Sequence, residues 1–300
     1  MAGSGPAPAI PVVISAAGLS GGNRALSALC RRRRIGEDRS GDNTFMMRLW
    51  LIASVTISLA GLAGCAPTFS EKAAHGIVFY CPGAGNTDFG DANVRRGLEQ
   101  AGYSGEVASF LWTLTFNVAL DQELRGPARA RATQLAGIIE DYAKQYPGQP
   151  INLVGLSAGT GIAMWAAEDL KNGVKVDNVV LLSSSLWNKF DAGPALKNIK
   201  GKVYVYYSPN DAVLAGPMKL FGSIDGVFGE DGAGAVGLHS PNGQDRIVNV
   251  PYRDDYAKFG YYGGHLDSTA PDFVRNYLAS HLIKPATAQA PGETVAIGPR

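Results

Sequence analysis

Ser157 is the residue of this chain that is best suited to covalent chemistry, because it stands in a G-x-S-x-G sequence at residues 155–159. An apolar run at 151–156 precedes it, and a run that is compatible with a helix follows at 160–167. Small residues on both sides of a serine permit a strained strand-to-helix turn that exposes the serine oxygen. The pattern therefore predicts a nucleophilic serine, whereas a glycine-rich turn with a hydrogen-bonded serine is the alternative.

Alternating strands and helices are predicted around this motif. Short runs rich in β-branched and aromatic residues are bounded by Gly, Pro, Asn or Asp, at 76–81, 106–111, 151–156, 177–183, 202–207 and 246–251. Residues 128–146 and 271–283 carry apolar residues at helical spacing. This order predicts an α/β fold in which a mostly parallel sheet of about six strands has helices on both faces. Ligands of such sheets bind outside the carboxyl ends of the strands.

On its strand–turn–helix motif, the sequence resembles the α/β-hydrolase superfamily of serine esterases and lipase-like enzymes. The resemblance covers about residues 75–284 through short motifs at strand ends. It implies a catalytic triad in the chain order nucleophile, acid, histidine. Asp211, which follows the run 202–207, matches the acid that would hold the histidine through its Nδ1–H. Asp191, after the preceding strand, is the alternative acid.

The resemblance also selects among the four histidines of the chain. His265 follows the last predicted strand and precedes the final helix, where the family carries its general base. His239 lies before that strand and is the alternative. His75 precedes the serine, against the family order, and His281 lies in the last amphipathic helix, where we expect an interfacial side chain.

The loop at 82–86, after the first strand, matches the part of the family fold that helps to bind the oxyanion. The resemblance implies one backbone donor at Ala158 and a second at Gly83 or Ala84. A phosphate-binding loop is the competing interpretation, but the lysine of G-x-x-x-x-G-K-[ST] is missing. The sequence contains no histidine- or cysteine-rich ligand cluster, so no metal and no cofactor are expected.

The start of the chain is typical of a targeting segment. Residues 1–45 predict a disordered leader or upstream sequence, although the arginine run 31–34 alone would fit an anionic surface. Residues 46–64 combine a basic start, an apolar stretch and small residues, as a secretory signal peptide does. The sequence before Cys65 resembles the lipobox of bacterial lipoproteins, which implies cleavage before Cys65 and its lipidation. An uncleaved signal anchor or a core strand is the alternative.

Composition and charge exclude several classes of protein. The chain has 300 residues, of which 46% are hydrophobic and 18% charged, with a net charge of +1. Removal of residues 1–64 takes seven of the 27 basic and three of the 26 acidic residues, so the remaining 236 residues carry −3. Such a chain buries a sizeable core and lacks the basic stripe of nucleic-acid-binding proteins. Cys81 is then left without a partner for a disulfide.

The domain organisation expected is a linker at 65–74, one hydrolase domain at 75–284 and a flexible tail at 285–300. The function expected is hydrolysis of a small-molecule or lipid ester through an acyl-enzyme on Ser157, by a monomer. The predicted location is the cell envelope, on the periplasmic or extracellular side, with membrane attachment through Cys65. The alternative is a catalytically silent lipoprotein of the same fold that binds a ligand or an envelope partner.

Overall fold

The computed structural model describes residues 67–86, 88–113 and 125–283 of the chain. The predicted leader, the signal peptide, Cys65 and the predicted tail lie outside the described residues. Within the predicted linker, Glu71–His75 forms the short 3-10 helix η1, whose Ala73 is buried. None of the helices in the described part of the chain has the length and apolar composition to cross a membrane.

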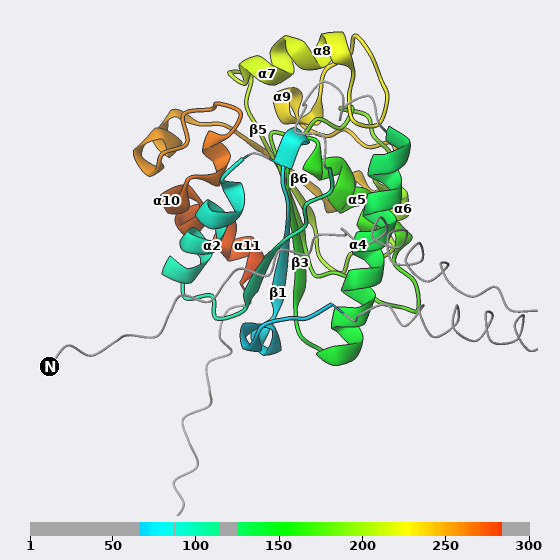
Figure 1. The fold of residues 1–300 in the computed structure, drawn as a ribbon. Helices are drawn as coiled ribbons and strands as arrows, with labels where there is room; N and C mark the ends of the chain where they lie inside the picture. The colour runs from blue at the N-terminus through cyan, green and yellow to red at the C-terminus, as the bar shows by residue number, and fades with distance from the viewer. Residues whose placement is uncertain (1–66, 87, 114–124, 284–300) are drawn as a thin grey trace, which may run out of the picture. The chain divides into compact units, whose positions relative to one another are not determined.

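Six parallel strands form one sheet in the order β2-β1-β3-β4-β5-β6 (Figure 1). The strands are β1 (Ile77–Cys81), β2 (Glu106–Ser109), β3 (Ile151–Leu156), β4 (Val179–Leu182), β5 (Val203–Tyr207) and β6 (Ile247–Pro251). Each of them lies within one of the six predicted runs. The predicted fold class, a parallel sheet of about six strands with helices on both faces, is confirmed.

The apolar runs are nearly continuous because both faces of the sheet are buried. In β1, Phe79 packs on one face with residues of the helices α4 (Arg125–Gln145) and α5 (Gly159–Asp169), such as Leu135 and Ile162. Val78 packs on the other face with residues of α2 (Gly90–Gln100) and of the C-terminal helices, such as Val94 and Phe273. In Figure 1 these two helical layers lie on opposite sides of the strands.

Most of the covering surface comes from three long helices: α2 (Gly90–Gln100), α4 (Arg125–Gln145) and α5 (Gly159–Asp169). The predicted C-terminal helix is divided into α10 (Pro271–Phe273), a π-helical turn at Val274–Leu278 and α11 (Ala279–Leu282). Four short helices connect the later strands: α6 (Gly193–Leu196), α7 (Ala212–Ala215), α8 (Pro217–Phe221) and α9 (Ala233–Val236). In Figure 1, α7, α8 and α9 lie together at one end of the sheet.

The register of the sheet aligns the strand ends. Cys81 pairs with Gly155, Leu156 with Leu182, and Tyr207 with Pro251, so that the segments following the strands leave from one edge, here called the carboxyl edge. The segment before β1 lies at the opposite, amino edge. There the backbone N–H and the Oγ of Ser70 donate to Oε2 of Glu106, the first residue of β2, at 2.9 and 3.1 Å.

Candidate active site

Ser157 forms the turn between β3 and α5 and has a φ of 51°, in the left-handed region that residues other than glycine seldom adopt. Such a conformation costs on the order of 1–3 kcal/mol and persists only where its surroundings impose it. Its N–H donates to the carbonyl of Leu182 at 3.0 Å, and its carbonyl accepts from the Thr160 hydroxyl at 2.5 Å and the Ser185 N–H at 3.3 Å. The predicted nucleophile therefore stands on a strained turn that the neighbouring strand holds in place.

The glycines of the motif are required by close packing. A Cβ on Gly159 would overlap the carbonyl oxygens of Cys81 and Pro82, and one on Gly155 would lie 2.7 Å from the carbonyl oxygen of Gly159. The first turn of α5 thus lies directly against the end of β1. This contact places the loop after β1 beside the serine.

Asp211 and His265 form a pair at the carboxyl edge, in which Asp211 is buried and His265 is partly exposed. The Nδ1 of His265 lies 2.8 Å from Oδ2 of Asp211, whose side chain is 0% exposed. Because an ionised carboxylate only accepts hydrogen bonds, Nδ1 carries the proton of a neutral imidazole and Nε2 is left as the proton acceptor. Asp211 is itself fixed as the N-cap of α7, since its Oδ1 accepts from the N–H groups of Val213 and Leu214 at 3.1 and 3.2 Å.

All three predicted triad residues leave the sheet from the same edge. Ser157 directly follows β3, Asp211 follows β5, and His265 follows β6 after the 3-10 helix η4 (Asp254–Phe259). Within the described residues, no hydrogen bond joins the Ser157 hydroxyl to His265. Catalytic hydrogen bonds often tighten only when a substrate is bound.

The three residues predicted to bind an oxyanion differ in their partners. The N–H of Gly83 donates to Oδ2 of Asp88 at 2.7 Å and is therefore engaged. Ala84 is the first residue of the 3-10 helix η2 (Ala84–Asn86), and Ala158 is the N-cap of α5. The N–H groups at the start of a helix have no acceptor within it. Within the described residues, the N–H of Gly83 thus has an acceptor, whereas those of Ala84 and Ala158 have none.

The side chains that hold this loop are not found by sequence reasoning. Asp88 lies three residues beyond the glycine pair and carries no motif, although an acidic residue two positions before a helix is a common turn and capping signal. Trp112 donates from Nε1 to the carbonyl of Pro82 at 2.8 Å. It belongs to the segment after β2, which neighbours β1 only through the sheet topology.

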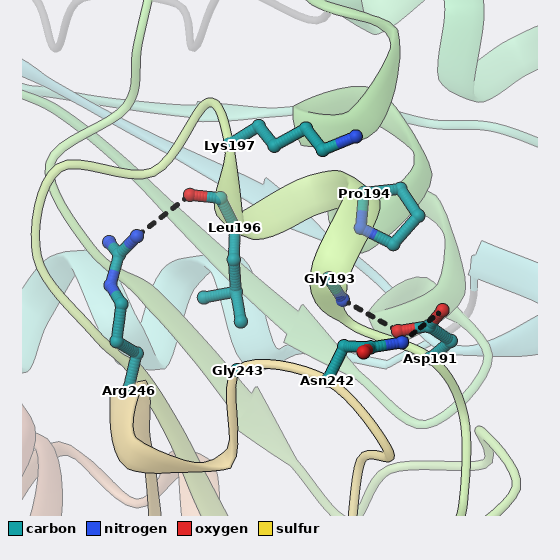
Figure 2. A pocket seen from close by; sticks show the side chains of 8 residues that line it. All are labelled: Asp191, Gly193, Pro194, Leu196, Lys197, Asn242, Gly243 and Arg246. Carbon is teal, nitrogen blue, oxygen red and sulfur yellow. Dashed lines mark hydrogen bonds between the residues drawn. The ribbon is translucent and has the colours of Figure 1, made fainter.

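The alternative acid and the alternative histidine lie elsewhere. Asp191 accepts from the Gly193 N–H at 2.9 Å and from Nδ2 of Asn242 at 3.0 Å. It lines a cavity of about 570 Å³ (Figure 2), whose other wall is formed by Arg246, just before β6. The guanidinium of Arg246 donates to the carbonyl of Leu196 at 2.8 Å (Figure 2). Because Arg246 immediately precedes β6, this wall of the cavity lies at the amino edge.

His239 is exposed, and its Nε2 lies 3.3 Å from the carbonyl of Val236. His281 stacks on Tyr204 with ring centroids 3.7 Å apart. Of the four histidines, all within the described residues, His265 is the one whose ring contacts a carboxylate. The described residues contain no group of three or more His, Cys, Asp or Glu side chains that could hold a metal ion.

Comparison with known proteins gives similarities to solved structures alone. No family model and no curated protein matches the sequence. A dienelactone hydrolase from Anabaena variabilis is 20% identical, with a TM-score of 0.41 over 69% of this chain and 84% of that one. A Trichoderma reesei cutinase, solved with a phosphonate inhibitor, is 15% identical, with a TM-score of 0.36 over 80% and 89%.

A dienelactone hydrolase-like promiscuous phosphotriesterase from metagenomic libraries is also similar, at 15% identity and a TM-score of 0.39 over 68% of this chain and 84% of that one. These identities and TM-scores are too low to indicate an activity for this chain.

Proposed function

We propose that this chain is a serine hydrolase of the α/β-hydrolase type that cleaves carboxylic esters through an acyl-enzyme on Ser157. The observation that carries the proposal is the 2.8 Å contact between the buried Asp211 and His265 at the same edge of the sheet as the strained serine. A carboxylate that orients an imidazole beside an activated hydroxyl is the arrangement that nucleophilic acyl transfer requires.

In the proposed reaction, the Ser157 hydroxyl attacks the ester carbonyl while Nε2 of His265 takes its proton. The carbonyl oxygen becomes negatively charged, and the N–H groups of Ala158 and Ala84 donate to it. Collapse of the tetrahedral intermediate breaks the ester C–O bond, and the imidazolium returns its proton to the leaving alcohol. Water, deprotonated by His265, then hydrolyses the acyl-enzyme and restores the serine. Throughout, Asp211 stabilises the imidazolium.

The test of this function is labelling of residues 66–300 with a fluorophosphonate probe, combined with turnover of a short-chain p-nitrophenyl ester. We expect covalent labelling and turnover by the wild type, and neither with Ser157→Ala. A Ser185→Ala variant is the matched control, because Ser185 has a buried hydroxyl close to the same turn. A folded wild type that is neither labelled nor active would contradict the proposal and favour a silent, ligand-binding chain.

We further propose that the enzyme acts in the bacterial cell envelope, anchored through a lipid on Cys65. The support is the order of a basic start, an apolar stretch and small residues before that cysteine. A small-molecule or lipid ester is the proposed substrate, and the enzyme is proposed to act as a monomer.

A further inference from the structure

We infer that Asp88 is a positioning residue that fixes the loop carrying Ala84, so that the N–H of Ala84 rather than that of Gly83 meets the substrate oxygen. The inference rests on the proposed function. Asp88 follows β1 by seven residues and has no place in the triad. Its contacts, its closeness to Ser157 and its charge each support this role.

The carboxylate of Asp88 binds three groups around the end of β1. Its Oδ1 accepts from the hydroxyl of Tyr80 at 2.7 Å and from the N–H of Gly90 at 2.9 Å. Its Oδ2 accepts from the N–H of Gly83 at 2.7 Å. Tyr80 lies within β1 and is fully buried, while Gly90 begins α2. One carboxylate therefore ties the loop to both the strand before it and the helix after it.

Asp88 acts close to the nucleophile. A Cβ placed on Gly83 would lie 3.4 Å from the Cβ of Ser157 and 3.6 Å from Oδ2 of Asp88. Gly83 thus lies beside both the serine and the carboxylate of Asp88. The N–H of Ala84 belongs to the peptide unit that follows Gly83. A change in the backbone angles of Gly83 therefore changes the direction of the Ala84 N–H.

The charge of Asp88 makes its orientation important. A free carboxylate this close to Ser157 would oppose the negative charge that develops on the substrate oxygen. Here the three donors occupy both of its oxygens, and the bond from the Gly83 N–H fixes its orientation at the start of the loop. Burial and the neighbouring carboxylate raise the pKa of the Tyr80 phenol well above its usual value, so this donor keeps its proton.

Substitution by asparagine separates these contacts. The single carbonyl oxygen of Asp88→Asn can still accept from Tyr80 and Gly90, but its NH₂ group faces the Gly83 N–H and cannot accept from it. The loop then loses the bond from the Gly83 N–H to Asp88, while the bonds of Trp112 to the Pro82 carbonyl and of the Asn86 N–H to the Gly83 carbonyl remain. Asp91→Asn is the matched control, because this substitution removes the same charge from the same segment. The Oδ1 of Asp91 accepts from the adjacent Ala92 N–H and does not contact the loop after β1 in the described residues.

The experiment measures kcat and KM for a p-nitrophenyl ester, together with thermal melting, in the wild type and both variants. For Asp88→Asn we expect kcat to fall about 10- to 100-fold and KM to change by less than about twofold. This fall in kcat does not exceed the fall that removal of one oxyanion donor causes. Asp91→Asn keeps the wild-type kcat. An equal kcat in all three proteins, or a rise in KM alone, would overturn the inference.

A second measurement does not depend on catalysis. In the wild type, amide hydrogen exchange at Gly83 should be slow for a loop residue, and it should become fast in Asp88→Asn while β1 stays protected. Fast exchange at Gly83 in the wild type would overturn the inference. An inactive wild type with a protected Gly83 would contradict the proposed function but not the loop contact, so the two failures are distinguishable.

Discussion

Asp211 uses its two carboxylate oxygens for different tasks, which substitutions can separate. Asp211→Asn keeps an oxygen to cap α7 but presents an NH₂ group to Nδ1 of His265, which favours the wrong tautomer. We expect kcat to fall by roughly 10⁴-fold with little loss of stability. Asp211→Ala removes both interactions, so it should also cost about 0.5–2 kcal/mol of unfolding free energy. Ester kinetics and denaturant unfolding measure the two effects.

Asp191→Asn is the control for this pair, since Asp191 faces Gly193 and Asn242 rather than a histidine. It should keep the wild-type kcat. A wild-type rate in Asp211→Asn together with a large loss in Asp191→Asn would move the acid of the triad to the alternative position.

Single residues with a motif could be predicted, and those that act through the fold could not. Ser157 is flanked by two glycines at positions where a Cβ would overlap the backbone, and the glycines themselves can be recognised in the sequence. Asp88 and Trp112 act on the loop after β1 through contacts that only the completed sheet creates. The choice between Gly83 and Ala84 depended on such a contact and therefore stayed open in the sequence.

At the scale of elements, the C-terminal helix α11 is held to β5 by His281. Its ring stacks on Tyr204, and its Nε2 lies 2.9 Å from the hydroxyl of Tyr206. Burial lowers the pKa of His281 below its usual value of about 6.5. The unfolded chain therefore binds a proton at His281 more readily than the folded chain does. The contribution of His281 to the free energy of unfolding is complete above about pH 6.5 and is lost as pH falls through the pKa of the folded state.

Replacing His281 by Gln should therefore reduce the slope of the unfolding free energy against pH between pH 7 and pH 5. The reduction should correspond to less than one proton taken up on unfolding. Urea unfolding at a series of pH values measures this slope. His239→Gln, at an exposed position, should leave the slope unchanged. If the free energy of unfolding of His281→Gln still falls steeply as the pH is lowered, the titration belongs to another group.

The strand bounds were predictable within two residues, because the strands are short, mostly apolar runs and most of their residues are buried. The connection from β5 to β6 was not. Residues 222–245 carry seven glycines and no apolar period, yet they include α9 and the fully buried Ile224 and Leu238. Their order comes from contacts such as the Ile224 N–H with the Ser185 carbonyl at 3.1 Å, which no local pattern encodes.

For the whole molecule, the proposed anchor has a direct test. Cys65→Ala should abolish incorporation of labelled fatty acid and release the protein from the membrane fraction, because no thiol is left to carry the lipid. Cys81→Ala is the matched control: this thiol is fully buried in β1, and burial raises its pKa, which leaves it unreactive. Continued labelling of Cys65→Ala would refute the anchor while leaving the ester chemistry of Ser157 unaffected.

The polarity of the sheet sets the direction in which such an anchored enzyme would work. Cys65 precedes Ser70 by five residues, which span at most about 17 Å in an extended chain, and Ser70 is bound to Glu106 at the amino edge. A lipid on Cys65 would thus hold the amino edge against its own bilayer, while Ser157 opens from the other end of the strands. The enzyme would then take its esters from the space facing that bilayer rather than from the leaflet in which it is embedded.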